Sequence, residues 1–164
     1  MVTIERSREV LAGLKEAGVD LVASVPDTNL LELITLLADD SGIAHISVGR
    51  EEEGIGVCTG AYLGGKRPAL VMQNAGLMNS CNGLTTTGLQ FGIPILLLVY
   101  YAGDIGDNAF HMLGLVTEPV LQGLGIKYTV LRNPAEVRKQ IVDASSICQA
   151  GKRPVAVLLT RDVL

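Results

Sequence analysis

Six short apolar runs constrain the fold of this chain more than any other feature of its sequence. Strands that are apolar along their whole length are typical of a parallel sheet that is covered on both faces. The sequence therefore predicts an α/β fold, with a six-stranded, mostly parallel sheet and helices on both faces. The runs lie at residues 19–25, 43–48, 67–73, 93–101, 126–131 and 153–160.

The segments between the apolar runs have the spacing of helices. Residues 3–17 place Ile4, Val10, Leu11 and Leu14 on one side of an amphipathic helix. Repeats, low-complexity segments and linkers are not visible, so we predict a single domain over residues 1–164. Further helices are expected at residues 29–39, 50–65, 109–124 and 134–150, and a helix or helix-like turn at 75–91. Pro26, Asp27 and Thr28 are expected to end the first strand and to cap the helix that follows it.

Composition excludes several classes of protein. The net charge of −4 argues against nucleic-acid binding, which normally requires a basic patch. The longest apolar run, residues 93–102, contains Pro94 and is shorter than the roughly twenty residues of a membrane helix. The N-terminus has no apolar core of a signal peptide, so we predict a cytoplasmic protein without membrane contact. Because 48% of the residues are hydrophobic and only 18% are charged, we expect a partner to cover part of the surface.

Cysteine and histidine usage gives no sign of a metal site. The three cysteines, Cys58, Cys81 and Cys148, lack metal-ligand spacing, and their odd number fits a reducing compartment. The chain has only two histidines, His45 and His111. We therefore predict that this chain contributes no metal ligands of its own.

Polar residues follow several of the predicted strands. In parallel α/β sheets, ligands bind outside the carboxyl ends of the strands. A ligand site is therefore expected where these ends meet. The polar groups are Pro26 with Asp27, residues 49–52, Gln73 with Asn74, and Gly103 with Asp104.

The segment REEEGIGVCTGAYLGG, residues 50–65, combines three glutamates with five glycines. Carboxylates are favoured at the start of a helix by its dipole, whereas each glycine inside a helix costs about 1 kcal/mol relative to alanine. A helix of this kind is expected to let another group approach closely. Successive helical residues point about 100° apart, so at most one of the three glutamates can face a given pocket. Periodicity alone does not choose among them, and a charged first turn on a tightly packed helix explains the same pattern.

Three segments resemble the pyrimidine-binding domain of thiamine-diphosphate-dependent 2-oxo acid decarboxylases. They are DLVASVPDTNLLELITLL, REEEGIGVCTGAYLGGKRPALVMQNAGLMNS and DNAFHMLGLVTEP, which follow one another in the order of that family. Within the family, the chain resembles the alpha subunits of sulfopyruvate decarboxylases, enzymes that are split into two short chains. The related phosphonopyruvate decarboxylases share the pattern at residues 72–79.

The resemblance implies a subunit of a 2-oxo acid decarboxylase that uses thiamine diphosphate and Mg2+. It further implies a beta subunit that carries the diphosphate-binding domain and holds most of the metal site. Each active site of the family lies between the two kinds of domain, so an α2β2 or larger assembly is expected. The substrate would be a small 2-oxo acid.

The resemblance also assigns roles to single residues. In the family, a glutamate stands ten residues before the helix tyrosine, and a glycine follows this glutamate by two residues. Tyr62 and Gly54 thus select Glu52, with Glu51 as the runner-up. Glu52 would hydrogen-bond nitrogen N1′ of the cofactor's pyrimidine ring. The catalytic residues would be Glu52, Asp27 and His111, the cofactor-binding residues Pro26, Glu52, Gln73 and Asn79, and the substrate-binding residues Asn74 and His111.

Two of these roles have structural alternatives. Asp27 would take part in proton transfer, and it is equally suited to cap the helix that follows it. His111 would lie over the substrate, and a lone histidine at such a position is also common on a protein surface.

Two departures from the family pattern bear on the function. Relatives that act on sulfonates or phosphonates carry an arginine soon after the fourth strand, where this chain has YYAGDIGD without a basic residue. A dianionic head group requires a cation, so the substrate is open between a sulfonate and a less charged or aromatic 2-oxo acid. The stretch GDIGDN has Asn108 where the family's GDG motif for diphosphate and magnesium ends in glycine. A carboligase subunit and a non-catalytic cofactor-binding or regulatory module remain the alternatives.

Overall fold

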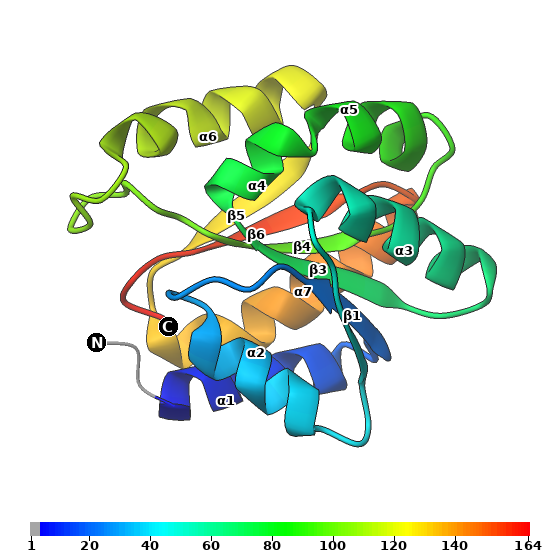
Figure 1. Cartoon of the computed structure of the whole chain (residues 1–164), viewed down its shortest axis with the longest axis horizontal. Helices are drawn as coiled ribbons and strands as arrows, with labels where there is room; N and C mark the ends of the chain where they lie inside the picture. Colours follow the sequence, from blue (N-terminus) through cyan, green and yellow to red (C-terminus); the bar gives the residue numbers. More distant parts are fainter. Residues whose placement is uncertain (1–3) are drawn as a thin grey trace.

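The computed structural model describes residues 4–164 and shows one sheet of six parallel strands, in the order β2–β1–β3–β4–β6–β5 (Figure 1). Each neighbouring pair of strands is parallel. The six predicted strands and the parallel sheet are therefore confirmed. The strands are β1 (Leu21–Ser24), β2 (Ala44–Ser47), β3 (Pro68–Gln73), β4 (Leu96–Tyr100), β5 (Lys127–Leu131) and β6 (Val155–Leu159).

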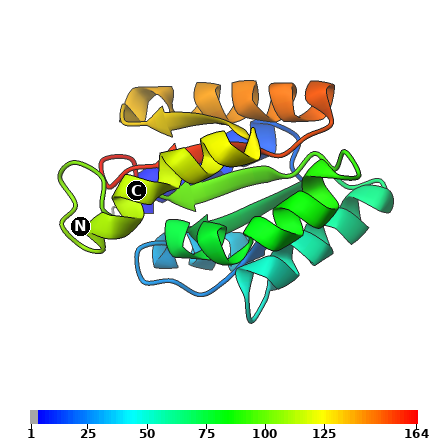
Figure 2. The same ribbon diagram turned by 90° about the horizontal axis from the view of Figure 1, so that it is seen from above.

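Helices cover both faces of the sheet. One face packs on α1 (Ile4–Glu16), α2 (Leu31–Asp39) and α7 (Val137–Gly151). The other packs on α3 (Glu51–Leu63), α4 (Asn74–Asn79), α5 (Cys81–Gly83), a π-helix at Leu84–Leu89 and α6 (His111–Leu124). Figure 2 shows α6, the α4–α5 segment and α3 lying side by side across this second face.

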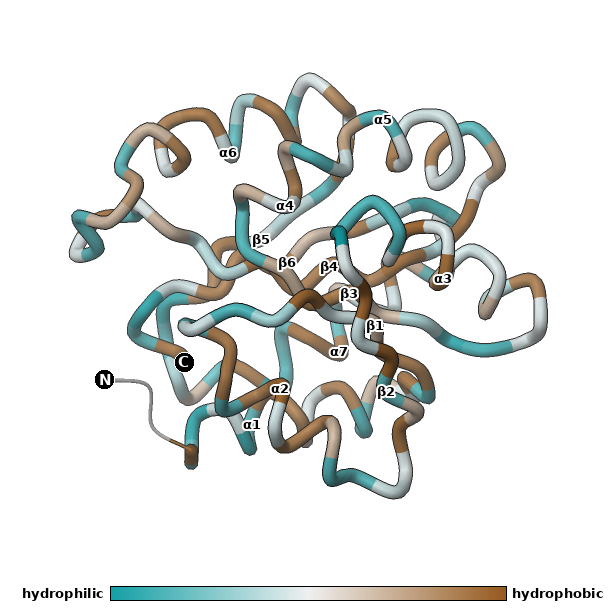
Figure 3. The backbone as a smooth tube through the Cα atoms, viewed as in Figure 1, coloured by the Kyte–Doolittle hydropathy of each residue, from teal (hydrophilic) through white to brown (hydrophobic). Residues whose placement is uncertain are grey.

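The sheet separates two hydrophobic cores, because both faces of each central strand are apolar. The residues of β4 and β6 are buried along their whole length, and those of β3 except its last residue. The apolar stretches of the backbone accordingly gather at the sheet in the middle of the molecule (Figure 3). Within the described residues, every helix is too short or too polar to cross a membrane.

Two expected helices differ from the prediction. The expected capping of α2 by residues 26–28 is wrong, since its N-cap is Leu30, whose side chain makes no capping bond. The segment 75–91 is not one regular helix but α4, α5 and the π-helix. The hydroxyls of Thr85 and Thr86 donate to carbonyls four residues earlier, a contact that bends helices. The N-terminal end of the first predicted helix, Thr3, lies outside the described residues.

The topology has a switch point at the ends of β1 and β3. These strands are neighbours, and the chain leaves β1 toward β2 on one side of the sheet and β3 toward β4 on the other. In α/β sheets of this kind, a ligand crevice is expected outside the carboxyl ends of the two strands. The carboxyl ends lie on the left of Figure 2, where the strand arrows point.

Candidate cofactor and active site

Asp27 and Gln73 meet at this switch point. Gln73 is the last residue of β3, and its Nε2 donates to Oδ2 of Asp27 at 3.2 Å. The other carboxylate oxygen of Asp27 accepts a hydrogen bond from the backbone N–H of Asn29 at 2.7 Å. Both contacts hold the carboxylate in one orientation, half-buried beside the exposed Pro26. The structure therefore brings two predicted site residues together and places a third beside them.

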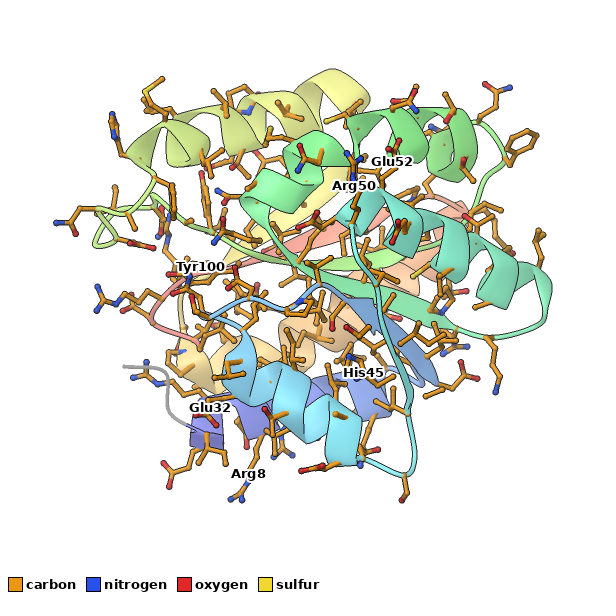
Figure 4. All side chains as sticks on the ribbon, viewed as in Figure 1. Arg8, Glu32, His45, Arg50, Glu52 and Tyr100 are labelled. Carbon is orange, nitrogen blue, oxygen red and sulfur yellow. The ribbon has the colours of Figure 1, made fainter. Side chains whose placement is uncertain are left out.

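The three glutamates of α3 have three different surroundings. Glu53 closes the first turn of the helix, because its Oε2 accepts from the backbone N–H groups of Gly49 at 3.0 Å and Arg50 at 3.2 Å. Oε1 of Glu52 accepts from Nδ2 of Asn82 at 3.0 Å, so Glu52 lies between α3 and α5 (Figure 4). Glu51 lies against Gly76 of α4, the helix that continues from β3.

The contact between Glu51 and Gly76 is close. A Cβ added to Gly76 would lie 2.2 Å from Cγ and 2.6 Å from Oε1 of Glu51, so only glycine leaves room for this carboxylate. Among residues 4–164, no group donates a hydrogen bond to Glu51 and no cation pairs with it. Glu51 is thus a half-buried carboxylate that keeps its hydrogen-bonding capacity.

The packing of α3 on β3 explains this orientation. A Cβ at Gly54 would lie 2.5 Å from Cδ1 of Leu70, so this glycine lets the helix approach the strand. Gly54, Ile55 and Cys58 are the buried residues of α3. Glu51 precedes them by three, four and seven residues and therefore belongs to the same stripe of the helix. Glu52 is rotated by about 100° from this stripe, toward α5.

Asn74 has a structural role in the described chain. Its side chain is fully buried, and Nδ2 donates to the carbonyl oxygen of Ala102 at 2.8 Å and to Oγ1 of Thr117 at 2.9 Å. These bonds tie α4 to the end of β4 and to α6. A contact between Asn74 and a substrate would require this packing to open, so its predicted substrate role is untested.

Asn79 and His111 lie on the surface. Asn79 is the exposed last residue of α4, and His111 is the exposed first residue of α6. Within the described residues, neither side chain is hydrogen-bonded to Asp27 or Gln73. Their predicted roles at a bound ligand therefore stay predictions.

Sequence reasoning missed Tyr100, Asp107 and Arg161, which extend the polar groups along the same edge. Tyr100 ends β4 opposite Gln73, and its hydroxyl donates to Oδ2 of Asp107 at 2.7 Å (Figure 4). Burial raises the pKa of Tyr100. The hydrogen bond to Asp107 and the negative charges of Asp107 and Asp27 raise this pKa further, whereas the positive charge of Arg161 lowers it. Local sequence gives no clear signal for Tyr100, which lies inside an apolar run, or for Asp107, and Arg161 comes beside them through the strand order.

Asp107 is held in its ionised form. Burial raises its pKa, but hydrogen bonds from the Tyr100 hydroxyl and from backbone N–H groups, together with the charge of Arg161, outweigh burial, so the pKa of Asp107 is lowered. Within residues 4–164, no group of three or more histidine, cysteine, aspartate or glutamate side chains is placed to hold a metal ion. The three cysteines are free thiols.

Comparisons with known proteins identify the family of this chain. Residues 6–118 match the family model described as "Thiamine pyrophosphate enzyme, N-terminal TPP binding domain". Over 155 residues, the chain is 44% identical to "Sulfopyruvate decarboxylase subunit alpha" of Methanococcus maripaludis, with 93% of each chain covered. The protein of the same name from Methanothermobacter thermautotrophicus is 39% identical over 158 residues, which cover 95% of this chain and 96% of the relative.

One further relative and one structurally similar protein are longer than this chain. "Sulfopyruvate decarboxylase" of Methanosarcina acetivorans is 31% identical over 133 residues, which cover 80% of this chain and 34% of the relative. A solved structure of 2-oxoglutarate:ferredoxin oxidoreductase from Magnetococcus marinus superimposes with a TM-score of 0.77 over 96% of this chain and 29% of the other. At 14% identity, the similarity to this oxidoreductase shows the fold alone.

Proposed function

Because this chain belongs to the thiamine pyrophosphate enzyme family through the N-terminal TPP binding domain, we propose that it is the alpha subunit of a thiamine-diphosphate-dependent 2-oxo acid decarboxylase of the sulfopyruvate decarboxylase type. The observation that carries the proposal is the 44% identity to a sulfopyruvate decarboxylase alpha subunit over 93% of both chains. The enzyme is then a carboxy-lyase, and this chain forms its pyrimidine-binding domain.

The residues at the carboxyl edge fit the pyrimidine half of the cofactor. Glu51, a carboxylate without a partner among the described residues, lies against Gly76 next to β3, and the amides of Gln73 and Asn79 and the ring of Pro26 offer further contacts. Thiamine diphosphate, when bound, supplies the electron sink that decarboxylation of a 2-oxo acid requires. The chain's own residues orient the pyrimidine ring and exchange protons at the edge of the sheet.

Two glutamates are candidates for the carboxylate that meets the pyrimidine ring. The family resemblance favours Glu52 over Glu51, and in the structure one carboxylate oxygen of Glu52 accepts a hydrogen bond from Asn82 in α5. Glu51 shares the buried stripe of α3, contacts Gly76 next to β3 and has no donor among the described residues. We therefore place Glu51 first and keep Glu52 as the second candidate.

Asp27 is the proposed proton-transfer group of this chain. Its two carboxylate oxygens accept from Gln73 and from the backbone of Asn29, so the side chain is oriented before a substrate arrives. A preoriented carboxylate can take up or release a proton at the reacting centre without reorganising.

The diphosphate and Mg2+ belong to a partner chain in this proposal. Mg2+ prefers oxygen ligands, and no cluster of carboxylates in residues 4–164 offers them. The expected beta subunit supplies the diphosphate-binding domain, and two chains of each kind complete the active sites. The loop 103–110 and the start of α6 expose Ile105 (93%), Phe110 (64%), Met112 (58%) and Leu115 (65%), which favours a covered surface.

Calorimetric titration with thiamine diphosphate and Mg2+ tests the proposal. The isolated chain should bind the cofactor weakly and release no carbon dioxide from sulfopyruvate, because it lacks the diphosphate site. The complex with the beta subunit should bind it and release carbon dioxide. Micromolar binding and turnover by the isolated chain would refute the two-chain proposal, and carbon–carbon bond formation without release of carbon dioxide would favour the carboligase.

A further inference from the structure

The proposed substrate class requires a cation that the expected position lacks. A sulfonate is a strong anion, and charge-assisted hydrogen bonds from arginine recognise such groups best. The stretch after β4, residues 101–110, contains neither lysine nor arginine. If the proposed function holds, a residue outside this stretch must supply the positive charge.

Two arginines reach the same edge of the sheet from other strands. Strand β6 lies beside β4, and β5 lies beside β6. The register pairs Tyr100 with Leu159, so Arg161 follows β6 next to the end of β4. Arg132 follows β5 one strand further out, since Leu131 pairs with Leu159.

Arg132 already forms an ion pair with Asp104. Its Nη2 donates to Oδ1 of Asp104 at 2.9 Å, and its Nη1 contacts the other oxygen of the same carboxylate. The side chain of Asp104 is only 8% exposed, so this two-pronged pair fixes the loop after β4 to the end of β5. Binding a substrate anion through Arg132 would break the pair and leave a buried carboxylate uncompensated.

Arg161 is differently placed. Arg161 is exposed, and none of the ion pairs among residues 4–164 includes it. Its positive charge acts on the Asp107 carboxylate and on the Tyr100 hydroxyl without forming an ion pair, and Asp27 influences the Tyr100 hydroxyl with the opposite sign. The hydroxyl of Tyr100 thus lies within electrostatic reach of both the proposed proton-transfer carboxylate and Arg161.

We propose that Arg161 binds the anionic head group of the substrate and so replaces the arginine that is missing after β4. The guanidinium group offers its donors to the sulfonate oxygens, while the 2-oxo acid end of the substrate lies toward Asp27 and the β1–β3 crevice. Arg161 is therefore a specificity residue, which acts on binding of the charged group and not on the bond that breaks.

The experiment uses the complete complex with thiamine diphosphate and Mg2+ at fixed ionic strength. R161Q and R161K are compared with R153Q, a matched control in which the exposed arginine at the other end of β6 is changed. R132Q tests the alternative arginine. The measurements are kcat and KM for sulfopyruvate, and the dissociation constants of 3-sulfopropanoate and of propanoate, which lacks the sulfonate.

R161Q should raise KM for sulfopyruvate and the dissociation constant of 3-sulfopropanoate about 10- to 100-fold. It should change kcat and the dissociation constant of propanoate by less than about threefold. R161K should recover part of the loss, and R153Q should resemble the wild type. Equal binding of 3-sulfopropanoate by R161Q and the wild type would overturn the inference and leave the proposed function intact. A larger loss in R132Q than in R161Q would overturn it in favour of Arg132. A wild-type complex that neither decarboxylates sulfopyruvate nor binds 3-sulfopropanoate would remove the proposed function, and this inference with it.

Discussion

The two edges of the sheet carry similar polar residues with different surroundings. At the amino edge of β1, Asp20 accepts from the backbone N–H of Arg67 at 2.8 Å and lies 3.8 Å from Nζ of Lys66. The Arg67 side chain donates to the carbonyl oxygen of Ala17 at 2.8 Å. At the carboxyl edge of the sheet, Asp27 bonds to Gln73, and Glu51 and Arg161 have no ionic partner among the described residues.

This difference separates structural from functional polar groups. The groups of the amino edge satisfy one another and join the loops before β1 and β3, which is the usual state of polar groups in a folded protein. Those of the carboxyl edge keep unused hydrogen-bonding capacity beside a topological switch point. Unused capacity in a half-buried carboxylate is available to a ligand or a partner, and this favours the carboxyl edge as the proposed site.

Removing the charge of Glu51 should have the largest effect on function. E51Q keeps the shape of the side chain but weakens the hydrogen bond to the pyrimidine ring, so kcat of the complete complex should fall at least about 10³-fold. Folding should be unchanged, because Glu51 has no protein partner among the described residues. Decarboxylation by the complex and circular dichroism of the chain measure the two quantities.

E52Q is the matched comparison for E51Q. Its amide can still accept from Asn82, so activity should stay within about tenfold of the wild type. A loss of activity in E52Q that exceeds the loss in E51Q would reverse the assignment and restore Glu52 as the carboxylate that meets the cofactor.

The two aspartates that flank β1 offer the next test. D27N should lower kcat about 10²-fold, because an amide cannot exchange the proton. D20N should leave kcat per folded molecule unchanged and lower the free energy of unfolding by less than about 1 kcal/mol, since the ion pair with Lys66 is exposed. Urea unfolding and steady-state kinetics of both variants check this contrast, and equal kinetic losses at the two ends would contradict it.

Gly76 is expected to act through Glu51. In G76A, the added methyl group would lie 2.2 Å from Cγ of Glu51, so this side chain must turn away from the crevice. Turnover should fall about tenfold although alanine favours the helix by about 1 kcal/mol. Kinetics of the G76A complex test this, and an unchanged kcat would show that the position of Glu51 is not critical.

Replacement of Gly56 by alanine should give the smallest effect, and it should stabilise the chain where the other substitutions impair it. Nothing lies within 4 Å of a Cβ at this position, so alanine fits without displacement. G56A should stabilise the isolated chain by about 0.5–1 kcal/mol through helix propensity. A loss of stability in urea unfolding of the isolated chain would contradict the open surroundings of Gly56.

The sequence predicted the strands well and the orientation of side chains poorly. Apolar runs located all six strands, because full burial in a parallel sheet leaves a clear pattern. The orientation of the glutamates depends on the contact between Gly54 and Leu70, which sequence periodicity does not contain. The bonds from the Asn74 amide to Ala102 and Thr117 join residues far apart in the chain, so local sequence does not show them, and the substrate role of Asn74 stays a prediction. Arg161 was missed because the pairing of β6 with β4 follows from the strand order, not from local sequence.

Hydrogen–deuterium exchange of the complete complex, with and without thiamine diphosphate and Mg2+, tests where the cofactor meets this chain. We propose that it does so at the carboxyl edge of the sheet. The cofactor should slow exchange in residues 26–29, 49–53 and 73–79 and leave residues 17–20, 64–67 and 152–154 of the amino edge unchanged. Slowed exchange at the amino edge, with none at the carboxyl edge, would contradict the account.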